Sequence, residues 1–227
     1  MRLAMILCFG FCASAALASS ARPQDVDEPL RIYGVHIDRT PKQSGTGLGI
    51  YLGRGLVITP AHVAGLGFWR RPRVEVDDHE LPTRVLKDGH FHNVDLTLLS
   101  VDERQLPARL ALRRMALCQS APWVGEEVIV ASRDGAGHSQ VISPYLLPLG
   151  LSVKYQTAIS YFPETSASGS GVFDANRKCL LGIISGKIWR YEIRQVDGNA
   201  VREPHDIASY FVPASKIADF IPPEDRF

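Results

Sequence analysis

Three short segments of the chain carry side chains that could act together in nucleophilic catalysis. They are TPAHV around His62, NVDLTLL around Asp95, and TSASGSGVFD around Ser168 and Ser170. A serine hydroxyl is a weak nucleophile unless a neighbouring base takes its proton, and an imidazole does this best when a carboxylate fixes its tautomer. A serine of the third segment, with His62 and Asp95, would meet that requirement.

Each of these residues also has a simpler interpretation when it is taken alone. A histidine after an apolar strand is commonly a packed or capping residue, and an aspartate before an apolar run is commonly a turn residue. A serine beside glycine is typical of a flexible loop. His90 and His92 could place two metal ligands on one face of a strand, but no second ligand pair is evident, so we expect exposed loop histidines, no metal site and no cofactor.

The pattern of apolar residues favours a mostly β protein. Short apolar or alternating runs are bounded by Gly, Pro, Asp or Asn, and almost no helical period is present. A less patterned stretch at residues 106–122 separates two groups of strands of similar size, and residues 213–222 have the pattern of a short closing helix. Strands are expected at residues 48–52, 56–59, 74–76, 96–101, 127–131, 140–147, 155–159, 180–185 and 210–212.

The composition sets limits on the partners of the chain. Its 227 residues are 45% hydrophobic, which is sufficient for a substantial core. The formal net charge is +1, so no overall field attracts nucleic acid or an anionic membrane. We therefore expect neither a nucleic-acid partner nor a stable membrane association once the first residues are removed.

The first residues have the composition of a secretory signal peptide. One positive charge precedes an uncharged stretch and then small residues, which predicts a signal at residues 1–18, with cleavage after Ala21 as the second choice. The protein is then expected to be secreted or periplasmic. Removal of the signal leaves Cys118 and Cys179 in an oxidising compartment, where we expect them to form a disulfide; two buried, unpaired thiols are the alternative.

Taken together and in order, these motifs resemble those of trypsin-like (chymotrypsin-fold) serine peptidases, in the compact bacterial form of HtrA-type and glutamyl-endopeptidase-like proteins. TPAHV matches the histidine motif, DLTLL the aspartate motif, and SASGSGVFD followed by CLLGIISG the nucleophile motif. The resemblance covers nearly all of the mature chain. It implies an all-β fold of two antiparallel six-stranded β-barrels with a short C-terminal helix, at residues 29–105, 123–212 and 213–222.

The resemblance also implies a role for each matched residue. Ser168 would attack a peptide carbonyl, His62 would carry its proton, and Asp95 would orient the imidazole. The motif favours Ser168 over Ser170 as the nucleophile, because Ser170 would place Val172 where the family keeps a small residue. The oxyanion-hole donors would be the backbone N–H groups of Ser166 and Ser168, and the substrate-pairing strand would contain Ser185, Gly186 and Lys187.

The match has two departures from the family pattern. Ser166 stands where the family usually has glycine, and a Cβ there disfavours the peptide orientation that the oxyanion hole needs. Ala167 stands where members activated by cleavage carry an aspartate, so no such activation is expected. The sequence thus predicts an exported serine endopeptidase acting on polypeptides. The alternative is a catalytically silent protein of the same fold that binds peptides or proteins.

Overall fold

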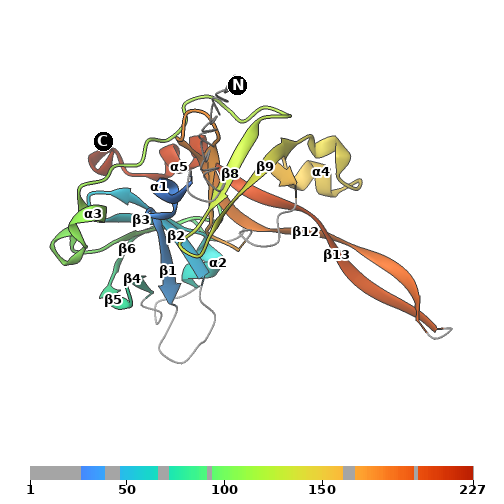
Figure 1. Ribbon diagram of the computed structural model, residues 1–227, viewed down its shortest axis with the longest axis horizontal. Coiled ribbons are helices and arrows are strands. Elements are labelled where there is room, and N and C mark those ends of the chain that lie inside the picture. Colours follow the sequence, from blue (N-terminus) through green and yellow to red (C-terminus); the bar gives the residue numbers. More distant parts are fainter. Residues whose placement is uncertain are drawn as a thin grey trace, which may run out of the picture.

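The computed structural model describes residues 27–38, 47–65, 72–90, 94–160, 167–196 and 199–226. The predicted signal peptide at residues 1–18 lies outside these ranges. The described chain is mainly antiparallel β structure in two sheets, one from each half of the sequence, and the C-terminal helix α5 (Ala214–Phe220) packs between them (Figure 1). Among the described residues, no helix has both the length and the apolar character needed to cross a bilayer.

The N-terminal sheet has seven described strands where the prediction was six. Their order is β5-β4-β1-β2-β3-β7-β6. β5 and β6 are separated only by Thr83, yet they pair with different strands: β5 pairs with β4, and β6 pairs with β7. Proline has no N–H for a ladder, so it suits the end of a strand. The strands are β1 (Gly34–Asp38), β2 (Gly47–Gly53), β3 (Leu56–Thr59), β4 (Arg73–Val76), β5 (His79–Pro82), β6 (Arg84–Asp88) and β7 (Thr97–Ser100).

The C-terminal sheet is a closed barrel of six strands, as the sequence predicted. The order around the barrel is β10-β13-β12-β11-β8-β9. Two of its strands, β12 and β13, extend well beyond residues 180–185 and 210–212, where the sequence predicted strands. The six strands are β8 (Glu127–Ala131), β9 (Ala136–Ile142), β10 (Ala158–Ser160), β11 (Gly171–Asp174), β12 (Leu180–Val196) and β13 (Asn199–Pro213).

Short helices complete the described structure. The stretch at residues 106–122 contains one of them, α3, and otherwise runs between the two sheets; Leu117 forms an isolated bridge with Leu180. Besides α5, they are α1 (Glu28–Arg31), α2 (Ala61–Ala64), η2 (Glu103–Gln105), α3 (Ala108–Ala111), η3 (Pro144–Leu146), α4 (Leu151–Lys154) and η4 (Pro223–Asp225).

The apolar runs of the sequence are buried on both faces of their strands. Successive side chains of a strand point to opposite faces. In β3, Val57 packs into the core of the N-terminal sheet, whereas Ile58 packs into a cluster shared with the other sheet. In β8, Val128 and Val130 fill the C-terminal barrel, whereas Ile129 joins the same shared cluster. This explains why these strands lack an alternating polar face.

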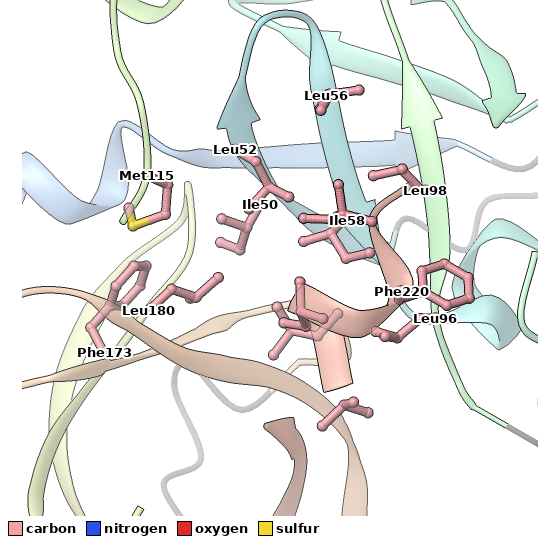
Figure 2. Packing of buried hydrophobic residues seen from close by; sticks show 14 of the residues in the cluster. Ile50, Leu52, Leu56, Ile58, Leu96, Leu98, Met115, Phe173, Leu180 and Phe220 are labelled. Atoms are coloured by element: carbon pink, nitrogen blue, oxygen red, sulfur yellow. The ribbon is translucent and has the colours of Figure 1, made fainter. Parts of the chain in front are cut away.

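The shared cluster joins the two sheets to α5. Figure 2 shows side chains of β2 and β3 facing those of β11 and β12, with Phe220 of α5 beside Leu96. Full burial of one such aliphatic or aromatic side chain contributes about 1.5–3 kcal/mol. The two halves therefore form one packed body. The labelled residues in the figure are Ile50, Leu52, Leu56, Ile58, Leu96, Leu98, Met115, Phe173, Leu180 and Phe220.

The predicted disulfide between Cys118 and Cys179 is present. The two Cα atoms are 5.1 Å apart, within the range for a disulfide. The bridge ties the segment that follows α3 to the start of β12, and the backbone N–H of Cys118 also donates to the carbonyl of Leu180 at 2.9 Å. The alternative of two free thiols is therefore wrong.

Candidate active site

His62 is positioned by the sharp transition from β3 into α2. Pro60 precedes the helix in an extended conformation, and its carbonyl accepts the N–H groups of Val63 and Ala64. Proline has no N–H to lose there, so the helix can begin within one residue of the strand. The imidazole of His62 is consequently held at the end of a buried strand with about 31% of its surface exposed.

Asp95 holds His62 through two hydrogen bonds. Its Oδ2 lies 2.8 Å from Nδ1 of the His62 ring, and its Oδ1 accepts the backbone N–H of His62 at 3.0 Å. The carboxylate is 7% exposed and stands two residues before β7, next to the fully buried Leu96. With the carboxylate as acceptor, Nδ1 carries the proton of the neutral ring, so Nε2 keeps its lone pair as a base.

Ser185 contributes a contact that the sequence reasoning missed. Its backbone was predicted to bind substrate, but its side chain donates to Oδ2 of Asp95 at 2.5 Å. Burial of Asp95 raises the pKa of its carboxyl, yet the hydrogen bonds from His62 and Ser185 outweigh this effect and hold the pKa below its ordinary value. Asp95 is therefore an anion that accepts three hydrogen bonds. No motif in the sequence distinguishes a serine with this role.

Ser168 sits at the tip of a tight turn between Ala167 and Ser170. The N–H of Ser170 donates to the carbonyl of Ala167 at 3.0 Å, and Gly169 adopts a φ of +98°. A positive φ at the third residue of a turn favours glycine. A Cβ at Gly169 would lie 1.8 Å from the carbonyl oxygen of Leu48, so the position also has no space for a side chain.

The structure distinguishes the two candidate serines. Ser170 is fully buried, and its Oγ has no hydrogen-bond partner among the described residues. Ser168 is only partly buried and lines the same cleft as His62 and Asp95. A substrate carbonyl can therefore approach the hydroxyl of Ser168 but not that of Ser170.

The hydroxyl of Ser168 donates to the backbone carbonyl of Ser185 at 3.2 Å, rather than to His62. Catalytic hydrogen bonds in unliganded sites are often long and become short only when substrate is bound. Ser168 and His62 line one cleft, so the contact with Ser185 leaves both residues in the same site.

The backbone at Ser168 provides one candidate oxyanion donor. Among the described residues, the N–H of Ser168 donates to no protein acceptor, so it is available to a ligand. The second predicted donor, the N–H of Ser166, lies outside the described residues. One preorganised donor of this kind is worth about 3–4 kcal/mol of transition-state stabilisation in enzymes where it has been measured.

The cleft has a volume of about 770 Å³ and is formed by both halves of the molecule. Gly186 and Lys187 line it, as does Tyr210, whose ring lies 5.0 Å from that of Tyr155. Burial, followed by the charge of Asp95, raises the pKa of Tyr210, so this side chain stays neutral. The described residues that line the cleft are His62, Val94, Asp95, Val153, Lys154, Tyr155, Gln156, Thr157, Ser168, Ser185, Gly186, Lys187, Tyr210, Val212, Pro213 and Lys216.

Of the two histidines weighed as metal ligands, His90 is described and does not line this cleft. His90 is exposed, and its backbone N–H donates to Asp88 at 3.0 Å; His92 is outside the described residues. Over the part of the chain that the structure describes, no three His, Cys, Asp or Glu side chains gather closely enough to hold a metal ion.

Comparison with known proteins identifies the fold. No protein-family model matches the sequence, and no curated protein is similar enough to be a relative. The active form of the Rv3671c protease from M. tuberculosis matches 96% of this chain and 92% of its own chain, with a TM-score of 0.59 and 17% identity. Kallikrein-related peptidase 10 matches 84% of this chain and 93% of its own, with a TM-score of 0.56 and 17% identity.

An HtrA-type protease also shares the fold. The protease AlgW, solved with a tripeptide, matches 86% of this chain and 60% of its own, with a TM-score of 0.54 and 17% identity. The predicted resemblance to trypsin-like serine peptidases, HtrA-type proteins included, is thus confirmed at the level of the fold.

Proposed function

We propose that this chain is an exported serine endopeptidase that hydrolyses polypeptides through Ser168, His62 and Asp95. The observation that carries the proposal is the row of contacts in one cleft: the buried anion of Asp95 binds Nδ1 of His62, and Nε2 is left as the base for a reachable serine. The fold shared with serine proteases adds support. Export is supported by the composition of residues 1–18 and is compatible with the disulfide.

The reaction follows from these contacts. His62 Nε2 takes the proton of Ser168 as Oγ forms a bond to the carbonyl carbon, and the imidazolium formed is stabilised by Asp95. The oxyanion accepts the backbone N–H groups of Ser168 and Ser166. The proton then passes to the leaving amine as the peptide bond breaks. Water then attacks the acyl carbon in the same way, with His62 as the base. The bond to Ser168 breaks, the serine regains its proton, and the acid is released.

A catalytically silent peptide-binding protein is the second candidate. It is favoured by one observation, the contact of the Ser168 hydroxyl with the carbonyl of Ser185 instead of His62. In that case the cleft would bind an extended peptide along residues 185–187 without cleaving it.

Hydrolysis of a disordered polypeptide distinguishes the two candidates. Casein is incubated with the mature wild-type protein and with Ser168→Ala, His62→Ala and Ser170→Ala, and the new termini are identified by mass spectrometry. The endopeptidase proposal expects cleavage by wild type and Ser170→Ala, with a loss of at least about 10³-fold in Ser168→Ala and His62→Ala. Casein that binds to the folded wild type but stays intact would favour the binding protein.

A further inference from the structure

Two strands of the C-terminal barrel continue past it as a two-stranded ribbon. β12 has 17 residues and β13 has 15, and their antiparallel pairing extends to Val196 opposite Asn199. The pairing of β12 with β11 ends at Ile183, and that of β13 with β10 begins at Ala208. We call residues 189–196 and 199–206 the arm. Figure 1 shows it projecting beyond the rest of the molecule.

The arm is a direct extension of the strand that lines the cleft. Gly186 and Lys187 of β12 line the cleft beside Ser168, and the arm begins two residues later at Trp189. Within the described residues, the arm part of β12 pairs only with β13, so its other edge presents unpaired backbone groups. Such an edge is a template for another strand.

The two faces of the arm differ in character. Alternation places Trp189, Tyr191 and Ile193 on one face, and these side chains are 46%, 46% and 74% exposed. The rings of Trp189 and Tyr191 pack edge to face at 4.9 Å. The guanidinium of Arg202 lies 3.7 Å from the centroid of the Tyr191 ring, and the rest of this apolar surface lies in solvent with no core behind it.

The opposite face of the arm is mainly polar, although Val201 lies opposite Arg194, and it carries its own ion pairs. Arg190 donates to Glu192 at 2.9 Å, and Arg194 lies 3.8 Å from Glu203. These ion pairs need no external partner. The parts of the arm that a partner could bind are therefore the unpaired strand edge and the Trp189-Tyr191-Ile193 face.

We propose that the arm is an extended substrate-binding strand for an unfolded polypeptide. This inference rests on the proposed function of the cleft. Because β12 runs away from Ser168, an antiparallel polypeptide runs toward Ser168, and its residues N-terminal to the reacting bond lie along the arm. Eight residues of strand span about 27 Å, so a long unfolded segment gains backbone hydrogen bonds and contacts between its apolar side chains and the aromatic face. A short peptide reaches only residues 185–187.

Binding to Ser168→Ala tests the arm independently of cleavage. Overlapping casein fragments of 6 and 14 residues are titrated by fluorescence anisotropy against Ser168→Ala with the full arm. The same titration uses Ser168→Ala in which residues 191–204 are replaced by Asn-Gly, a two-residue turn that joins Arg190 to its partner His205. We expect the best 14-residue fragments to bind at least tenfold more tightly than 6-residue ones, and the shortened arm to abolish that gain. An equal gain with both proteins, or no gain with the full arm, overturns the proposal.

Two further measurements keep the test valid if the shortened chain does not fold. Tyr191→Ala is expected to weaken binding of the long fragments several-fold, whereas its matched control on the polar face, Glu192→Ala, is not. Long fragments N-methylated at alternate residues of their N-terminal half should bind no better than short ones, because N-methylation removes strand hydrogen bonds. Unchanged binding of the N-methylated fragments contradicts strand addition.

Failure of the arm proposal can be distinguished from failure of the proposed endopeptidase function. If the wild type cleaves casein but the full arm gives no gain with length, the arm proposal fails alone. If the full arm binds long fragments more tightly than short ones but the wild type leaves casein intact, the endopeptidase proposal fails. The arm then belongs to a peptide-binding protein.

Discussion

The backbone N–H of Leu48 in β2 donates to the carbonyl of Ser168, 3.1 Å away. The carbonyl of the same Leu48 accepts the hydroxyl of Thr59 at 2.7 Å, three residues before His62. One residue of the N-terminal sheet thus connects the turn that holds Ser168 to the strand that leads to His62. The relative position of Ser168 and His62 therefore depends on contact between the two halves.

Substitution of Gly169 by alanine should disrupt this connection. The new Cβ would lie 1.8 Å from the Leu48 oxygen and 2.3 Å from its carbonyl carbon, at a φ of +98°. Backbone strain and overpacking together should lower the free energy of unfolding by about 2–4 kcal/mol and displace Ser168. Urea denaturation and the rate of casein cleavage measure the two effects.

Gly186→Ala is the matched control for Gly169→Ala. A Cβ at Gly186 meets no atom within 4 Å, so the free energy of unfolding should change by less than about 0.5 kcal/mol. The methyl group would stand on the strand that lines the cleft and should reduce casein cleavage without reducing stability. Equal stability losses in the two variants would contradict this description of the turn.

Loss of the Ser185 hydroxyl should make the protein more sensitive to acid. The pKa of Asp95 is lowered in the folded state, so its carboxylate contributes stability above the ordinary value of about 3.9, and this contribution is lost as the pH falls through the folded pKa. Ser185→Ala removes a hydrogen bond to the charged form and raises the folded pKa. Acid unfolding should then begin at a higher pH, with a loss of about 1.5–3 kcal/mol at pH 7.

The measurement is the free energy of unfolding in urea between pH 7 and pH 3. Ser209→Ala serves as the control. The Oγ of this serine is buried and has no hydrogen-bond partner in the described part of the chain, so its loss should be neutral or slightly stabilising. An acid profile of Ser185→Ala that coincides with the wild type would show that Ser185 does not support the charge of Asp95.

Removal of the disulfide should be costly. Cys118 and Cys179 are 61 residues apart, and closing a loop of that length is worth about 4 kcal/mol in the chain-entropy estimate. The double variant Cys118→Ala and Cys179→Ala should lose stability of that order in urea unfolding. A reductant should destabilise the wild type similarly and leave the double variant unchanged. Two titratable thiols in the unreduced, denatured wild type would contradict the bridge.

The segments of the candidate site could be predicted because the chemistry proposed for them and their fold impose short, local patterns. Thr59 through His62 combine a buried strand end with a helix start, and the turn at Ser168 needs a glycine in the next position. The choice of Ser168 over Ser170 also followed from the motif. The role of the Ser185 side chain could not be predicted, because it depends on contact with Asp95, which lies 90 residues earlier in the chain.

The arm was missed for a different reason. The sequence of the arm is rich in charged residues, which favoured a loop. In the structure these residues lie on strands that are exposed to solvent. The alternation of Trp189, Tyr191 and Ile193 with Arg190, Glu192 and Arg194 was a period-two signal, and the Asp197-Gly198 pair is a favoured hairpin turn sequence. Strands β5 and β6 were not predicted either, because their pairing depends on contact with β4 and β7.

Mapping of a fluorophosphonate adduct tests the central claim most directly. The probe is incubated with wild type, Ser168→Ala, His62→Ala and Ser170→Ala, and the modified residue is located by mass spectrometry. The account predicts one adduct, on Ser168, that is absent from Ser168→Ala, strongly reduced in His62→Ala and retained in Ser170→Ala. An adduct on Ser170, or a folded wild-type protein that forms none, would contradict it.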